Sequence, residues 1–205
     1  TKTDKALVKF LDDYETKFLG KTTVLCKDTP AFIANRIGVY SIMALFHLVE
    51  EMGLTVDEVD KLTGPVMGRP KSATFRTCDV VGLDTLVHVA NGVRQNCPND
   101  EANKLFEIPS YVQQMVDKNW LGSKTKQGFY KKEKNKDGSS EILSLNLKTL
   151  EYEPKQKVKF AALEASKPVN DLAERMKLLV NFKDKAGEFY RKSFYGLFAS
   201  LSNRV

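Results

Sequence analysis

One apolar segment near the N-terminal end constrains the fold of this chain more than any other feature. Between Thr29 and Gly53 apolar side chains fill most positions, and almost no polar face remains at helical spacing. A helix that is apolar on nearly all sides must be buried. We therefore predict a helix with Thr29 as its N-cap and Pro30 at its first position, which ends at Gly53. It should form the centre of a helical domain or part of an oligomer interface.

The other periodic segments mostly favour helices as well. Apolar residues recur at helical spacing from Leu7 to Phe18, and Thr55 and Glu58 form the sequence pattern of a capping box. The same signals predict further helices near residues 55–64, 72–81, 84–95, 109–119, 158–166, 170–181 and 184–202.

Two segments favour β structure. Residues 22–26 are short and rich in β-branched side chains, which predicts a strand directly after the first helix. Such a helix–strand pair is typical of the end of an α/β sheet whose other strands are missing. Residues 128–130 and 141–143 flank a turn around Asp137 and Gly138, which predicts a hairpin. The expected fold class is therefore mainly α, with a small β remnant and a short hairpin.

Composition restricts the class of protein. The 205 residues are 42% hydrophobic and 28% charged, as in a folded soluble protein. Three cysteines, Cys26, Cys78 and Cys97, lie far apart, which favours a reducing, cytoplasmic compartment and argues against a structural zinc site. No segment has the roughly 18 apolar residues that a membrane span needs, and residues 1–5 lack the layout of a signal peptide. We expect no metal and no membrane span.

The basic net charge of +6 raises the question of nucleic acid. Six lysines lie within residues 124–136, but aromatic residues do not alternate with them as they would on a surface that stacks bases. The run is typical of a solvated loop. The sequence therefore disfavours nucleic acid as a partner.

Four motifs in a fixed order carry a family resemblance. They are residues 27–36 (KDTPAFIANR), 65–70 (PVMGRP), 79–85 (DVVGLDT) and 122–130 (GSKTKQGFY). Together they resemble the L-3-hydroxyacyl-CoA dehydrogenase family, over roughly residues 4–132. The form of the second loop, MGRPKSATFRT, resembles the long bifunctional members that join the dehydrogenase to an enoyl-CoA hydratase.

The resemblance implies a division of the chain into three parts. Residues 1–27 would be the terminal helix and strand of a Rossmann domain that binds NAD and is otherwise missing. Residues 28–132 would be the helical C-terminal domain. Residues 133–205 would be a hairpin, a linker and the start of a truncated second helical repeat. The dinucleotide fingerprint GxGxxG and the family's catalytic histidine–glutamate pair are absent, so the chain alone should be inactive.

The resemblance also assigns roles to single residues. Asn35 matches the asparagine that donates to the substrate oxygen; otherwise it is a polar residue at a helix terminus. Lys124 matches a lysine that reaches the dinucleotide, or else it is one solvated lysine among several. Met67 and Gly68 would border the acyl channel, where a glycine lets a substrate approach, or they would only join two helices.

Two histidines do not fit a catalytic role. His47 lies one helical turn before Glu51, a contact that is common without function. His88 has no partner at helical spacing.

The expected function is thus the substrate-binding and dimerisation part of an NAD-dependent dehydrogenase. It would act on 3-hydroxyacyl-CoA and 3-ketoacyl-CoA in fatty-acid β-oxidation, as a homodimer. A non-catalytic dimerisation or scaffold module and a polyanion-binding domain remain as alternatives.

Overall fold

Most of the described chain is helical, as predicted. The structure, a computed structural model, describes residues 3–135 and 138–203. Its α-helices are α1 (Lys5–Phe18), α2 (Ala34–Met52), α3 (Val56–Thr63), α4 (Phe75–Val81), α5 (Leu83–Asn96), α6 (Ser110–Asp117), α7 (Ala161–Ser166), α8 (Leu172–Asn181) and α9 (Lys185–Ser202). Short 3-10 helices are η1 (Pro65–Met67), η2 (Asn103–Phe106) and η3 (Ser123–Thr125), and the strands are β1 (Tyr130–Lys134), β2 (Ser140–Leu145) and β3 (Tyr152–Pro154).

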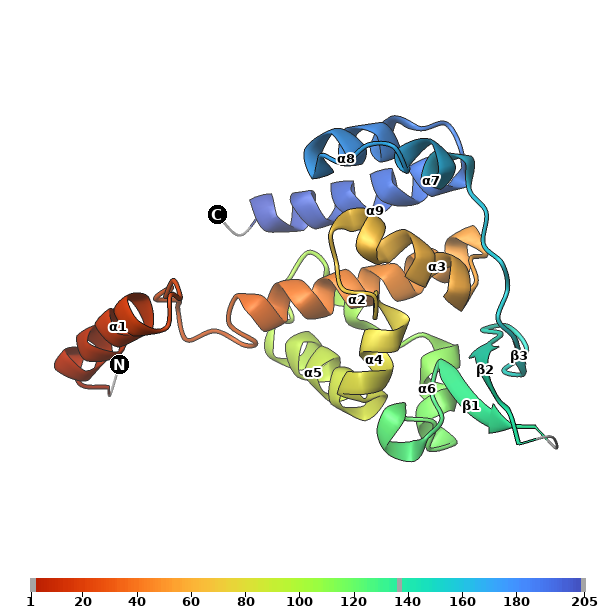
Figure 1. Cartoon of the computed structure of the whole chain (residues 1–205). Helices are drawn as coiled ribbons and strands as arrows, with labels where there is room; N and C mark the ends of the chain where they lie inside the picture. Colours follow the sequence, from red (N-terminus) through yellow and green to blue (C-terminus); the bar gives the residue numbers. More distant parts are fainter. Residues whose placement is uncertain (1–2, 136–137, 204–205) are drawn as a thin grey trace.

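Helix α2 is the centre of the fold. It packs against α9, α5 and η2, and Figure 1 shows α9 and α5 on opposite sides of it. From Val39 to Val49 no side chain is exposed. Other elements of the same chain thus cover the apolar side chains of this helix. Its predicted central position is confirmed.

The predicted start of this helix is wrong. Thr29 does not cap it and Pro30 does not begin it, because the helix starts at Ala34 and its N-cap, Ile33, makes no side-chain capping bond. The two residues after the proline, Ala31 and Phe32, have left-handed φ angles of 65° and 50°. A left-handed residue interrupts the run of right-handed dihedrals that a helix needs. The threonine hydroxyl can hydrogen-bond to nearby backbone groups, and proline restricts its own φ angle. Both properties favour a turn as well as a helix start.

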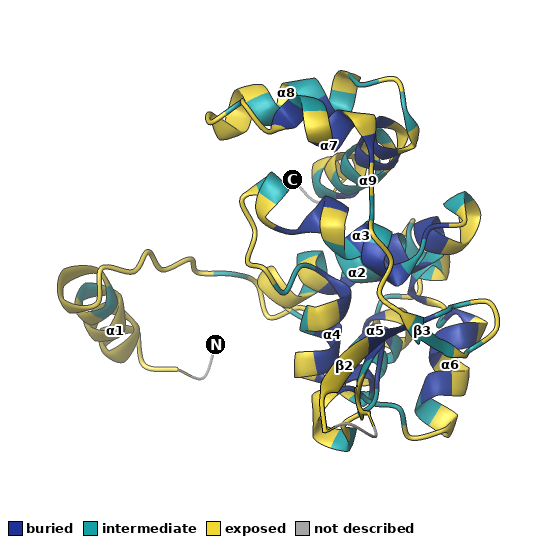
Figure 2. Cartoon of the chain, turned by 45° about the vertical axis from the view of Figure 1, so that its right-hand side comes forward, coloured by how far each residue is buried: buried dark blue, intermediate teal, exposed yellow. Residues whose placement is uncertain are grey.

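The predicted strand at residues 22–26 is also wrong. These residues have no regular secondary structure, although the helix before them, α1, is confirmed. A strand needs a neighbour for its backbone hydrogen bonds, and the sheet that the structure describes is built from β1, β2 and β3 alone. Helix α1 contains no buried residue and lies apart from the other helices (Figures 1 and 2).

The predicted hairpin is confirmed and extended. Strands β1 and β2 are antiparallel with Tyr130 opposite Ser144, and β3 adds to β2 with Pro154 opposite Leu143. Asp137, in the predicted turn, lies outside the described residues. The third strand escaped prediction because it is three residues long and ends in proline, which is tolerated only at a sheet edge.

The C-terminal helices belong to the same hydrophobic core as α2. Side chains of α7, α8 and α9 join a single buried cluster with those of α2 and α3. Two tyrosines link them through hydrogen bonds: the Tyr190 hydroxyl donates to the Leu62 carbonyl at 2.8 Å, and the Tyr40 hydroxyl donates to the Gly196 carbonyl at 2.9 Å. No helix within the described residues is both long and apolar enough to cross a membrane.

Replacing Phe46 by alanine should destabilise the fold by about 3–5 kcal/mol. Its ring is fully buried on α2, with ring centroids of Phe75, Tyr111 and Phe129 at 5.8, 6.0 and 5.7 Å. Urea unfolding followed by circular dichroism measures the change. The matched variant Phe10→Ala removes an exposed ring of α1, a helix with no buried residue, and should change stability by no more than about 0.5 kcal/mol. Equal losses in the two variants would contradict this packing.

Candidate functional site

A buried carboxylate connects two of the motifs. Asp79, in α4, is 2% exposed and accepts hydrogen bonds from the backbone N–H groups of Phe129 and Tyr130 at 2.8 and 2.9 Å. Its motif, 79–85, is thereby fixed against the end of motif 122–130. Burial raises the pKa of Asp79 to about 6, and the two backbone hydrogen bonds oppose this rise.

The glycines of motif 122–130 permit this contact. A Cβ atom on Gly128 would overlap the Asp79 side chain, and one on Gly122 would overlap the Asp79 backbone. Gly122 also has a φ of 107°, which L side chains rarely adopt. Both positions therefore require glycine, so that the backbone of this motif can lie against Asp79.

Lys124 is held by a second contact between the same two motifs. Its Nζ donates to both carboxylate oxygens of Asp84, in the first turn of α5, and this hydrogen bond lowers the pKa of Asp84. The lysine chain also passes close to Gly82, where a Cβ would lie 3.2 Å from its Cε. The Lys124 and Asp84 side chains remain 47% and 43% exposed, so the ammonium group is fixed in place and still open to a ligand.

Asn35 is exposed in the first turn of α2, and its neighbour Arg36 fixes that turn. Arg36 forms an ion pair with Asp100, whose side chain is 4% exposed, and donates to Cys97 Sγ at 2.9 Å. Its guanidinium lies 5.5 Å from the centroid of the Phe106 ring. Sequence reasoning missed this anchor, because a partner more than sixty positions away leaves no local signal.

Met67 is the last residue of η1, and Gly68 follows it. Met67 is partly buried against the core cluster. Gly68, with a φ of 72°, faces α8, since a Cβ there would lie 2.8 Å from Leu172 Cδ2. The missing side chain of Gly68 thus lets α8 approach, which fits the structural alternative.

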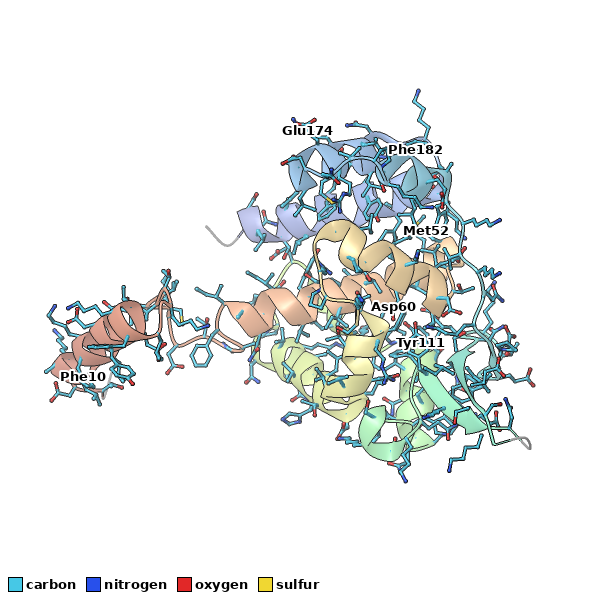
Figure 3. All side chains as sticks on the ribbon, in the orientation of Figure 1. Phe10, Met52, Asp60, Tyr111, Glu174 and Phe182 are labelled. Atoms are coloured by element: carbon cyan, nitrogen blue, oxygen red, sulfur yellow. The ribbon has the colours of Figure 1, made fainter. Side chains whose placement is uncertain are left out.

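A network around Asp60 adds residues that the sequence did not single out. The Asp60 carboxylate caps α4 by accepting from the backbone N–H groups of Thr74, Phe75 and Arg76, and it also accepts from the Tyr130 hydroxyl at 2.8 Å. Figure 3 places Asp60 where α3 faces α4. Burial raises the pKa of Asp60. The network ties α3, α4 and β1 into one rigid unit.

The predicted site residues therefore lie on separate elements. Among the described residues, no hydrogen bond or ion pair joins any two of Asn35, Gly68 and Lys124. The same part of the chain contains no group of three His, Cys, Asp or Glu side chains arranged to hold a metal ion.

Neither histidine forms an acid–base pair. His47 Nε2 lies 3.1 Å from the carbonyl oxygens of both Leu105 and Glu107, while Glu51 pairs with Lys192. His88 is exposed on α5. His47 thus has a structural role, in agreement with the rejection of a catalytic one.

Asp79 should make stability depend on pH. The unfolded chain ionises this carboxyl near pH 3.9, whereas the folded chain keeps the proton up to about pH 6. The folded state binds more protons within this window, so the free energy of unfolding should fall as pH rises through it. Asp79→Asn has no such proton, so wild type should lose more stability than the variant between pH 4 and pH 7. Urea unfolding at both pH values measures this, and equal losses would refute the assignment.

Comparisons with known proteins bear on the family of this chain. A family profile described as 3-hydroxyacyl-CoA dehydrogenase, C-terminal domain, matches residues 32–132, a range that includes Asn35 and Lys124. A probable 3-hydroxyacyl-CoA dehydrogenase of Bacillus subtilis is 46% identical over 185 residues, which are 90% of this chain and 23% of that protein. One of the same description from Deinococcus radiodurans is 46% identical over 134 residues, which are 65% of this chain and 38% of that protein.

A solved structure shares the fold. The crystal structure of FadB2 from M. tuberculosis superposes with a TM-score of 0.53 at 29% identity, over 63% of this chain and 44% of that one. The chain thus spans less than half the length of each of these relatives. Through residues 32–132, the chain belongs to the 3-hydroxyacyl-CoA dehydrogenase family, as part of its C-terminal domain.

Proposed function

We propose that the chain is the substrate-binding and dimerisation part of an NAD-dependent L-3-hydroxyacyl-CoA dehydrogenase of fatty-acid β-oxidation. The supporting observation is that Asp79 and Asp84 connect two family motifs and fix Lys124 at their junction. The reaction would transfer a hydride from C3 of a 3-hydroxyacyl-CoA to NAD and a proton from the 3-hydroxyl group to a base. The product would be a 3-ketoacyl-CoA.

Asn35 is the residue of this chain that we assign to the reacting oxygen. Its amide is neutral and exposed at the N-terminal end of α2, where unpaired backbone N–H groups add a partial positive charge. The Arg36–Asp100 ion pair holds this turn in place. The amide N–H would donate to the substrate oxygen and stabilise negative charge that develops on it.

Lys124 is the residue that we assign to the dinucleotide. Its exposed ammonium group is a suitable donor to an acceptor on NAD, and Asp84 orients it. The sequence has neither a GxGxxG loop nor the histidine–glutamate pair, so we propose that turnover requires a second, NAD-binding domain. A channel role for Met67 and Gly68 stays a prediction. The free cysteines Cys26, Cys78 and Cys97 support a cytoplasmic location.

Asn35→Ala, made in the enzyme that combines this chain with its NAD-binding domain, should lower turnover about 10²-fold. The amide bond should be strongest as charge develops, so kcat should fall more than KM rises. Steady-state oxidation of 3-hydroxybutyryl-CoA, followed by NADH absorbance, measures both. The control Asn181→Ala, at the exposed end of α8, should leave them unchanged. Turnover within about twofold of wild type, with CoA binding intact, would make Asn35 structural.

The 205-residue chain should self-associate, with a mass near twice 23.1 kDa by light scattering. Tyr195 and Phe198 are 63% and 58% exposed on one face of α9, and such apolar patches mark association surfaces. A two-fold dimer is the commonest arrangement that covers such a patch. Replacing both by serine should give monomer, whereas Ile142→Ser on β2 should not. A wild-type monomer at high concentration would exclude dimerisation, and with it the scaffold alternative.

A further inference from the structure

A basic cavity of about 1010 Å³ lies outside the residues assigned to the dehydrogenase reaction. Residues of α3, η1, α7 and α8, the start of α4 and the segment 155–159 line it. Eight lysine and arginine side chains and three carboxyl side chains contribute to the lining, an excess of five positive charges. Figure 1 shows the segment between β3 and α7 as a drawn-out connection along this side of the molecule.

The three carboxylates in the cavity already have partners within the protein. Asp57 accepts from the Ser144 hydroxyl at 2.7 Å and from the Gln156 backbone N–H at 3.0 Å. Asp60 accepts from three backbone N–H groups of α4 and from a tyrosine hydroxyl. Glu164 pairs with Lys167 on the same helix. These acids therefore compensate few of the cavity's cations.

Most of the cations have no acidic partner. Within the described residues, none of five cavity side chains forms an ion pair: Lys61, Lys71, Arg76, Lys157 and Lys159. Like charges gathered in one cavity repel one another and raise the local concentration of anions.

Arg175 adds a half-buried positive charge. Its guanidinium donates only to neutral carbonyl oxygens, those of Val66, Val169 and Asn170 at 3.4, 2.8 and 3.0 Å. A half-buried cation without a carboxylate is costly unless an anion approaches it. The positive charge of the cavity is therefore not confined to its exposed lysines, since Arg175 adds a half-buried cation to the lining.

The segment 155–159 supplies three of the lysines in a regular pattern. Lys155, Lys157 and Lys159 alternate along it, and all three line the cavity. Alternate side chains of an extended segment point the same way, about 6.6 Å apart. Such a row can contact more than one anionic group of a single ligand.

We propose that this cavity binds a compact ligand with two or more adjacent phosphate groups, of the nucleotide diphosphate class to which coenzyme A and ADP belong. The volume is that of a small-ligand site. The choice of coenzyme A rests on the proposed function, whereas the site itself rests on the cavity and its charges. A nucleic-acid strand fits less well, since the Tyr130 ring, which could stack on a base, is covered by Lys155 Nζ at 4.7 Å.

Calorimetric titration of the 205-residue chain with coenzyme A, ADP and inorganic pyrophosphate tests the proposal. All three should bind, and more weakly in 0.5 M salt because exposed charges are screened (about 4 Å Debye length). The double variant Lys157→Glu and Lys159→Glu should weaken each affinity at least about tenfold (1.4 kcal/mol). The matched double variant Lys132→Glu and Lys134→Glu reverses two exposed lysines of β1 outside the cavity, and should change affinity less than about twofold.

Equal losses in the two double variants would overturn the site in favour of general charge attraction. Preference for a single-stranded oligonucleotide or for anionic lipid vesicles would also overturn it. Circular dichroism and urea unfolding check the fold, and Lys61→Glu with Lys71→Glu must reproduce the loss from another side of the cavity. None of these measurements involves hydride transfer, so failure of the Asn35 assignment and failure of this site can be distinguished.

Discussion

The need to cover α2 on every side determines the arrangement of the other elements. From Val39 to Val49 every side chain of this helix is buried or half-buried. Helix α5 and η2 cover it in the first half of the chain, and α9 returns from the end of the chain to cover another side. The core is therefore continuous from α2 to α9, although the two helices are separated by more than 130 positions.

Sequence periodicity predicts this part of the fold well and its irregular parts poorly. The apolar stripe of α9 and the capping box of Thr55 and Glu58 are local patterns, and both are present in the structure. The errors fall at 22–26 and at the start of α2, where local preference does not decide the outcome. A strand depends on a neighbour, and the left-handed turn at Ala31 and Phe32 depends on how the chain enters the domain.

For the candidate site, sequence motifs mark positions without their partners. Motif similarity marks Lys124, but only the structure shows that Asp84 holds it. Arg36 stands beside Asn35 in the first motif, yet its partner Asp100 comes from a different loop. The basic cavity could not be predicted from the sequence, because its lining residues lie far apart along the chain. Its lysines and arginines come from separate segments, and none of the described lysines in the run at 124–136 lines it.

The junction of Asp79 with the two glycines also has a consequence for evolution. Any side chain at Gly122 or Gly128 overlaps Asp79, and loss of the carboxylate leaves the buried amides of Phe129 and Tyr130 without their acceptor. Each single substitution is therefore deleterious, although a concerted change could restore the packing. Asp79, Gly122 and Gly128 therefore depend on one another. We expect these three positions to change together in evolution and not one at a time.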